Sequence, residues 1–341
     1  MEDQPKNPKM SDVARLSGVS LTTVGRVLHH NGYVSEENRR RVEAAVRELG
    51  YIPNSMASSL KNSSSRMLGH ILAFSPNLLF EQISRAVDQA ASARGYSVLS
   101  FTKYGLAGED ERIVTEFIGR RVDGVVVTSI QDFPQDLLDR LERSGIPSVR
   151  IERAPAGADR VLVDDLRGTY EAVASITRAG HRRIAFVGLE GPAEVERLRL
   201  QGYRSALLDA GIAPTPALER MVPSYGAACG FAAMQSLWEA ERPTAVFATA
   251  DTLICGALQF LYGAGARVPE DLSLMGYDNT LSTLLAPPVS SVGIHAGEMG
   301  ERAVDLLLRR KADPKGPREE YLVGTELMDR GTVRRLFTET P

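Results

Sequence analysis

Apolar and polar residues near the start of the chain follow the spacing of short helices separated by turn residues. From Met10 to Leu49 the apolar residues recur at helical intervals, without strand-like alternation. The pattern predicts a first helix over residues 11–17 that ends at Gly18, where a positive φ is accessible. Ser20 is placed to cap a second helix that extends to about residue 28. The expected motif is helix, tight turn, helix.

A third helix is predicted to open at Ser35, with Glu36 and Glu37 near its positive end. Its apolar residues fall on one face and end before Gly50; they are Val42, Ala45, Val46 and Leu49. This stripe is suited to cover the first two helices.

A short fourth helix is predicted over residues 55–61, after Pro53 and a capping Asn54. Its apolar edge is thin, because Leu60 has only Met56 beside it at helical spacing. A helix this short does not hold on its own, so it needs a partner or a ligand. The polar run that follows, over residues 62–66, reads as a linker.

Beyond Leu68, nearly continuous apolar runs alternate with amphipathic helical stretches. The predicted strands are LGHILAF, YSVLSF, DGVVVTS, IPSVRIE, RVLVD, RIAFVG, TAVFATA and LSLMGY. The predicted helices include residues 81–94, 109–120, 168–179 and 228–238. Such alternation predicts parallel sheets with helices on both faces, and this region is long enough for two lobes.

Composition narrows the class of protein. The chain has 341 residues and a formal net charge of -3, which argues against a surface that is basic throughout. Residues 1–65 contain nine Lys or Arg against seven Asp or Glu, whereas the rest contains 31 against 36, so the basic excess lies in the head. No apolar run reaches the roughly 18 residues of a membrane span, and the start lacks a secretory signal, so we expect a cytoplasmic protein. Cys229 and Cys255 have neither metal-ligand nor disulfide-scaffold spacing and read as reduced packing residues.

Two other functional classes find little support. An enzyme is disfavoured because the sequence has no phosphate-binding GxxxxGK[ST] loop and no metal-spaced histidine cluster. Asp164 and Asp165 are adjacent, and adjacent strand residues face opposite ways, which argues against paired catalysis. A solute-binding transport protein would share the two-lobed fold, but the helical head and the missing export signal argue against it. We expect no cofactor and no metal.

The segment MSDVARLSGVSLTTVGRVLHHNGYVSEENRRRVEAAVRELGYIPNSMASSLKN resembles the head and hinge of the LacI/GalR family of bacterial transcription regulators. Matching blocks continue along the chain as DGVVVTS, AGHRRIAFVG, RLQGYRSAL, RVPEDLSLMGYDN and TELMDRGT. Three positions depart from the family pattern. Lys9 replaces the usual Thr cap, Gly25 replaces Ser, and Ala250 replaces the Asn of an Asn-Asp pair, which removes an amide that relatives resembling the lactose repressor use on their ligand.

The resemblance implies an all-α helix-turn-helix head joined to a two-lobed α/β sensor similar to periplasmic binding proteins, with parallel sheets. The expected head covers residues 1–54, the hinge helix and linker 55–66, and the effector-binding and dimerisation domain 67–341. Within the sensor, the expected first lobe comprises residues 67–165 and 292–325, and the second 166–291 and 326–341.

In a helix-turn-helix protein, the second helix enters the major groove with its N-terminal side chains nearest the bases. Arg26 is suited to pair with guanine, Thr22 to bond several base edges, and Leu21 to contact a thymine methyl. The candidates for phosphate contacts are Ser20, Thr23, Asn31 and Arg39. In the hinge, two copies of the helix would pair across a dimer axis and insert Leu60 into the minor groove, with Asn54 and Ala57 beside it. The alternative is a passive linker.

In the sensor, parallel strands bind ligands beyond their carboxyl ends, and paired lobes bind them in between. Asp164 and Asp278 each end a predicted strand, and the resemblance places a further set of residues along the effector cleft: Phe80, Glu152, Arg199, Tyr225 and Asp278. The two carboxylates of Glu152 and Asp278 would accept hydrogen bonds from vicinal hydroxyls, and Arg199 would donate. An aromatic ring would stack on the flat face of the ligand.

The sequence therefore predicts a homodimeric, effector-controlled transcription regulator, a repressor, that binds a pseudo-palindromic double-stranded operator and no membrane. A sugar or related polyol is the first expectation for the effector, and a nucleobase or nucleoside the second. Whether the effector releases or promotes DNA binding, and whether the assembly is a dimer or a tetramer, stay open at this stage.

Overall fold

The computed structural model describes residues 8–28, 31–52, 64–129, 133–152, 157–191 and 194–336. The chain divides into two compact units, Met1–Ser65 and Arg66–Pro341, and each is described by itself.

The first unit contains three helices among its described residues: α1 (Met10–Ser17), α2 (Leu21–Leu28) and α3 (Glu36–Leu49). The sequence predicted all three to within a residue. Val13, Val24, Val27, Val42 and Ala45 form the buried core of this unit. The predicted helix over residues 55–61 lies outside the described residues.

The two departures from the family pattern in the head have physical explanations. Lys9 has no side-chain acceptor to cap α1. Instead its backbone N–H donates to Asp12 Oδ2 at 2.9 Å, so the Asp12 side chain stabilises the start of the helix. A Cβ at Gly25 would lie 3.1 Å from the terminal methyl of Met10, so glycine leaves room for Met10 between α1 and α2.

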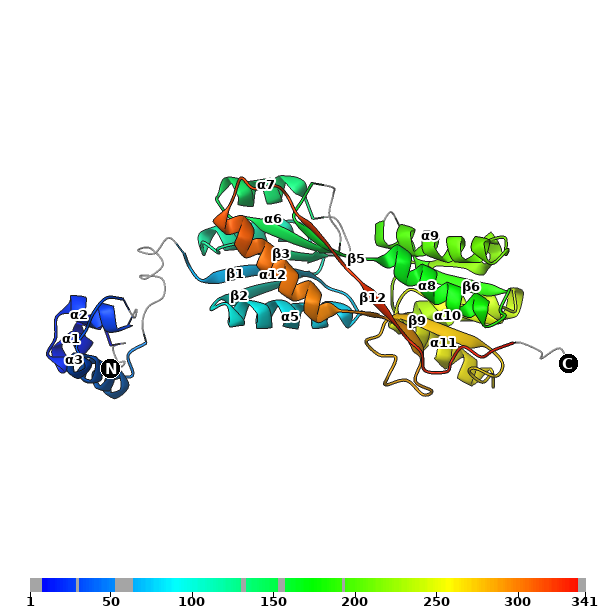
Figure 1. The fold of residues 1–341 in the computed structure, drawn as a ribbon, viewed down its shortest axis with the longest axis horizontal. Helices are drawn as coiled ribbons and strands as arrows, with labels where there is room; N and C mark the ends of the chain where they lie inside the picture. Colours follow the sequence, from blue (N-terminus) through cyan, green and yellow to red (C-terminus); the bar gives the residue numbers. More distant parts are fainter. Residues whose placement is uncertain are drawn as a thin grey trace. The chain divides into compact units, whose positions relative to one another are not determined.

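Within the described residues, the second unit contains two six-stranded sheets, and the sheets define its two lobes. The first lobe has the strand order β11-β5-β4-β3-β1-β2, and its strands are all parallel. The strands are β1 (Met67–Ala73), β2 (Ser97–Lys103), β3 (Val125–Ser129), β4 (Ser148–Glu152), β5 (Arg160–Val163) and β11 (Glu320–Val323). Helices α5 (Leu79–Ala93) and α12 (Ala296–Ala312) pack on one face, and α6 (Glu109–Gly119) and α7 (Gln135–Arg143) on the other (Figure 1).

The second lobe has the corresponding order β12-β10-β9-β8-β6-β7. Its strands are β6 (Ile184–Leu189), β7 (Glu219–Val222), β8 (Ala245–Ala248), β9 (Ser273–Asp278), β10 (Ser290–Ile294) and β12 (Thr325–Met328), of which β12 is antiparallel to β10. Helices α8 (Asp165–Arg178) and α9 (Glu194–Asp209) cover one face, and α10 (Ala227–Ala240) and α11 (Asp251–Gly263) the other. A short 3₁₀ turn, Pro216–Leu218, precedes β7.

The described chain passes between the two sheets three times, from β5 into α8, from β10 into α12, and from β11 into β12 (Figure 1). The second of these passages lies after Ile294, because β10 pairs with β9 and β12 of the second lobe. The lobe boundary that the sequence analysis drew between residues 291 and 292 therefore falls inside a strand. No helix among the described residues is long and apolar enough to cross a membrane.

Candidate functional site

Helix α2 packs one face against the core of the first unit and exposes another face to solvent. Val24 and Val27 are buried in the core of the first unit. Leu21 is 52% exposed, and Thr22 and Arg26 are exposed as well. Leu21 lies in the first turn of α2 and Arg26 in its last; that these exposed side chains read base edges stays a prediction.

The predicted phosphate contacts lie in and beside α2 and in α3. Ser20 Oγ accepts from Thr23 N–H at 3.1 Å and lies 2.9 Å from Thr23 Oγ1, so this pair also caps α2. Asn31 is exposed and Arg39 is half-buried. The predicted hinge contacts, Asn54, Ala57 and Leu60, lie outside the described residues.

In the second lobe, Arg199 of α9 is the centre of a buried polar cluster. Its Nε donates to Asp165 Oδ1 at 2.7 Å, and its Nη1 donates to Glu196 Oε1 at 3.3 Å and to the backbone oxygen of Thr249 at 2.9 Å. Its guanidinium lies 4.1 Å from the ring centroid of Tyr277. Contacts on three sides fix the plane of the guanidinium.

Two tyrosine hydroxyls complete the cluster. Tyr225 donates to Glu196 Oε1 at 2.6 Å, and Tyr277 donates to Asp165 Oδ1 at 2.9 Å. The other oxygen of Glu196 accepts from the backbone N–H of Leu189 at 2.9 Å, at the end of β6. We call Asp165, Glu196, Arg199, Tyr225 and Tyr277 the arginine cluster.

Burial controls the ionisation of this cluster. It raises the pKa of both Asp165 and Glu196 despite the attraction of Arg199. Burial alone would lower the pKa of Arg199, but the charge of Asp165 and the other acidic groups holds it well above the ordinary value. One permanent cation thus faces two carboxylates, so the cluster has no spare positive charge to offer an anion.

Asp278, at the end of β9, connects the lobes. Its Oδ2 accepts from Nδ2 of Asn77, which follows β1 of the first lobe, at 2.7 Å, and both residues are buried. Asn77 Oδ1 in turn accepts from the backbone N–H of Leu79 at 2.9 Å, in the first turn of α5. The amide therefore ties the start of α5 directly to the carboxylate of the other lobe.

Asp251 holds the turn that carries Asp278. Its Oδ2 accepts three backbone N–H groups, of Thr280, Leu281 and Ser282, at 2.7–3.0 Å. Its Oδ1 accepts from the hydroxyls of Ser282 and Ser291. Asp278 has a φ of 88°, a strained backbone for a residue with a side chain, and this bonding stabilises the turn that follows it. Asp251 is thus a structural acceptor.

The other predicted residues of the sensor occupy different settings. Phe80 is buried in the first turn of α5, yet it belongs to none of the four apolar clusters that the described residues form. Asp164 caps α8 by accepting from the backbone N–H of Arg167 at 3.2 Å and is half-exposed, apart from the buried Asp165. Glu152 ends β4, and its side chain lies outside the described part of the structure.

The sequence analysis proposed Arg199, Tyr225 and Asp278 as effector contacts, which stays a prediction, but it did not foresee the residues that bond to them in the structure. Glu196 had a readable signal, because it lies three residues before Arg199 on the same helix face. Asp165 was considered only as a catalytic partner of Asp164 and not as a partner of an arginine. Asn77 had no local signal, since its contact with Asp278 joins residues 201 positions apart.

No group of three or more His, Cys, Asp or Glu side chains in the described ranges is arranged to hold a metal ion.

Comparisons with known proteins agree with this geometry. Residues 9–54 match the family model described as bacterial regulatory proteins, lacI family, and residues 173–333 match a periplasmic binding protein-like domain. The HTH-type transcriptional repressor PurR of Vibrio atlanticus is 33% identical over 96% of this chain and 99% of its own. The ribose operon repressor of Escherichia coli is also 33% identical, over 95% of this chain and 99% of its own.

Solved structures agree over the same span. The lac repressor dimer bound to operator and the anti-inducer ONPF has a TM-score of 0.85 at 28% identity and covers 96% of this chain and 100% of its own. The complex of the transcriptional regulator CelR with cellobiose has a TM-score of 0.72 at 30% identity and covers 95% of this chain and 99% of its own. The chain belongs to the LacI family of bacterial regulatory proteins and is a DNA-binding transcription regulator.

Proposed function

We propose that this protein is a homodimeric repressor whose affinity for a pseudo-palindromic operator is controlled by a small neutral polyol, most simply a sugar, held between its two lobes. It acts in the cytoplasm and catalyses no reaction. The observation that carries the proposal is the hydrogen bond from Asn77 to Asp278, which links the lobes beside the arginine cluster. A ligand that binds Asp278 competes with Asn77 for this carboxylate or bridges the two residues, and so changes how the lobes close on each other. Closure of two lobes around a ligand is a common means of control.

The chemistry of the cluster supports a polyhydroxylated ligand. Asp278 can accept hydrogen bonds from hydroxyl groups, and it directly follows Tyr277 of the arginine cluster. Burial and the nearby charges of Glu196 and Asp278 raise the pKa of Tyr225, which keeps its hydroxyl protonated. Phe80 supplies an aromatic surface that is not committed to an apolar core. Because the cluster holds one cation against two carboxylates, a neutral ligand is favoured over a phosphorylated one.

The relatives support the same class. One is named a ribose operon repressor, and a similar solved structure is a complex with cellobiose. A nucleobase or nucleoside is the second candidate, since Phe80 could stack on a flat ring.

A thermal-shift screen against sugars, sugar acids and nucleosides tests the effector class. A ligand at about 100 times its Kd should add ~2.7 kcal/mol to the free energy of unfolding. Asp278→Asn should lose most of this gain and make operator binding insensitive to the ligand, whereas Asp209→Asn, an exposed change in the same lobe, should behave as wild type. If only sugar acids or only nucleosides stabilised the protein, that class and not a neutral sugar would be the effector.

The DNA-reading part of the proposal rests on the outward face of α2. Arg26→Ala should cost roughly 1–3 kcal/mol of specific binding and relax the base preference at one position in each half-site. Selection of operators from a random DNA pool measures both effects. Identical selected sequences for wild type and variant would remove Arg26 from the residues that read DNA.

A further inference from the structure

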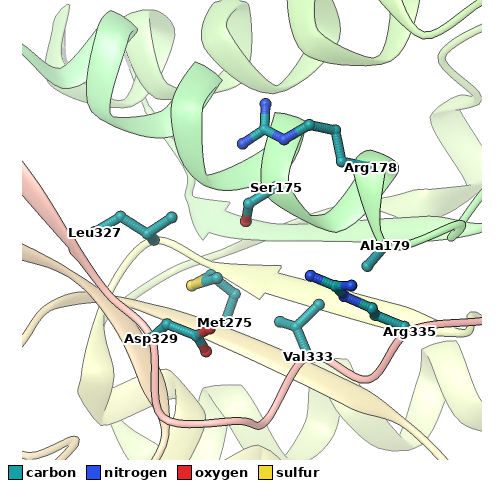
Figure 2. Close-up of a pocket in the computed structure, with 8 residues that line it drawn as sticks. All are labelled: Ser175, Arg178, Ala179, Met275, Leu327, Asp329, Val333 and Arg335. Atoms are coloured by element: carbon teal, nitrogen blue, oxygen red, sulfur yellow. The ribbon is translucent and has the colours of Figure 1, made fainter.

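A second pocket lies in the second lobe, away from the arginine cluster. It has a volume of about 400 Å³ and opens between the C-terminal part of α8 and the segment that follows β12 (Figure 2). Two contacts hold that segment in place: Leu336 N–H donates to the backbone oxygen of Ala179 at 2.7 Å, and Arg334 N–H donates to Ser273 Oγ at 3.1 Å. The walls of the pocket are thus fixed by hydrogen bonds.

Two arginines border this pocket, Arg178 at the end of α8 and Arg335 near the end of the described chain. Both are exposed, and neither forms an ion pair with any residue that the structure describes. Three arginines elsewhere in the same lobe, Arg167, Arg183 and Arg204, are each neutralised by a glutamate at 2.5–2.7 Å. Figure 2 shows both arginines at the border of the pocket, Arg335 beside Val333 and Arg178 on the α8 side beyond Ser175.

The rest of the pocket sets the shape of a ligand. Met275 is almost fully buried and, with Leu327 and Val333, provides an apolar lining. Asp329 lies on the side away from the two arginines in Figure 2, and its Oδ1 accepts from Ser290 Oγ at 3.1 Å and from Gly331 N–H at 3.0 Å. An anionic group is therefore attracted to the arginine end and repelled from the Asp329 end.

We propose that this pocket binds a small organic oxyanion, with the carboxylate or phosphate between Arg178 and Arg335 and a short apolar part over Met275. Guanidinium groups form paired, charge-assisted hydrogen bonds with both kinds of oxyanion. Ser175 also lines the pocket, but its hydroxyl donates to the backbone oxygen of Ala172 at 2.6 Å, so the two arginines carry the anion. The site is separate from the proposed effector site and does not depend on it.

Calorimetric titration of the whole protein with butyl phosphate, butyrate and 1-butanol, at constant ionic strength in chloride, tests this inference. Butyl phosphate, butyrate or both should bind, and 1-butanol should not; which anion binds more tightly identifies the headgroup. Arg178→Gln and Arg335→Gln should each weaken binding about tenfold. Arg267→Gln removes another exposed charge of the same lobe, at a residue that does not line the pocket, and should leave binding unchanged.

Both test variants replace exposed side chains and should keep the wild-type melting temperature, so lost binding would not reflect lost folding. Binding that survives both substitutions would belong to another place on the protein and would overturn the inference. Failure of both anions to bind would overturn it as well. Operator binding is not a readout here, so the outcome is independent of the proposed control by a sugar.

Discussion

The two lobes of the sensor share a strand order but differ in the chemistry at the ends of their strands. The second lobe provides the charged residues Asp165, Glu196, Arg199 and Asp278, all buried. Among the residues whose side chains are described, the first lobe reaches Asp278 with the neutral amide of Asn77, and its charged pair where β2 ends, Lys103 and Asp110, is bonded to itself. The contrast suggests different roles. The second lobe carries a binding surface whose charged groups are already positioned without a ligand, and the first lobe acts as a cover attached to it by a hydrogen bond.

The charged groups of the second lobe are positioned without a ligand because they pair with one another. Buried charges are tolerated where partners and hydrogen bonds compensate their loss of water. Glu196 alone accepts from Arg199, Tyr225, Thr249 and the backbone of Leu189. The geometry of Arg199 therefore does not depend on a ligand, whereas the position of the cover can.

The largest expected effect comes from removing the centre of the arginine cluster. Arg199→Met should lower the free energy of unfolding by about 3–5 kcal/mol, because it leaves two buried carboxylates without their cation. Urea unfolding followed by circular dichroism measures this loss. The result would show that Arg199 stabilises the second lobe in addition to any contact with a ligand.

Arg204→Met on the same helix is the matched control. Arg204 pairs with Glu219, but its side chain is 47% exposed, so the loss should stay within about 1 kcal/mol. Equal losses for both variants would contradict the view that the arginine cluster is the compensated core of the lobe.

A buried histidine makes the first lobe sensitive to acid. His70 in β1 is fully buried, with Nε2 2.9 Å from Thr128 Oγ1, and burial lowers its pKa from 6.5 to about 3. Between pH 6.5 and pH 3 the imidazole of His70 is protonated in the unfolded chain but neutral in the folded protein. The stability contributed by the neutral, buried side chain is therefore complete above pH 6.5 and is lost as the pH falls towards 3. At pH 5 the loss should be about 2 kcal/mol relative to pH 7.

Unfolding curves of wild type and His70→Gln at pH 7 and pH 5 isolate this effect, because other titrating groups are common to both proteins. The variant should lose about 2 kcal/mol less than wild type on acidification. His181 of the second lobe also has a pKa lowered by burial, but it has three partners, Thr244, Ser273 and the backbone oxygen of Arg334. Equal acid sensitivity after replacement of His70 would show that protonation of His70 is not the cause.

The fold was predictable where hydrophobicity alone determines the structure. Strands β1, β3 and β6 are buried on both faces and so read as continuous apolar runs. Strand β10 was missed because Ser290 and Ser291 are buried in it through hydrogen bonds to Asp329 and Asp251. Strands β11 and β12 were missed because each has only four residues, of which only Val323 is fully buried.

The candidate site could be predicted only where its residues lie in sequence motifs. The family resemblance supplied Arg199, Tyr225 and Asp278, which occupy motif positions. Their partners are determined by the packing of distant elements: Asp165 reaches Arg199 from α8, and Asn77 reaches Asp278 from the other lobe. Such contacts leave no periodic signal in the sequence.

The smallest of these effects bears on the link between the lobes. Asn77→Asp keeps the oxygen that accepts from Leu79 N–H but places a carboxylate where the Nδ2 donor lies 2.7 Å from Asp278. Like charges at this distance repel, so the lobes should close less readily around a ligand. We expect effector affinity to fall about tenfold, equivalent to ~1.4 kcal/mol, with operator affinity in the absence of effector unchanged.

Calorimetric titration of the effector identified by the thermal-shift screen measures the change. Gln82→Glu adds the same charge at an exposed position of α5 and should bind as wild type, which separates local repulsion from net charge. Asn77→Ala removes the donor without adding a charge, and its affinity should fall between those of wild type and Asn77→Asp. If Asn77→Asp bound the effector as tightly as Gln82→Glu, the first lobe would not act as a cover attached through Asp278, and control would have to reach the head through the second lobe alone.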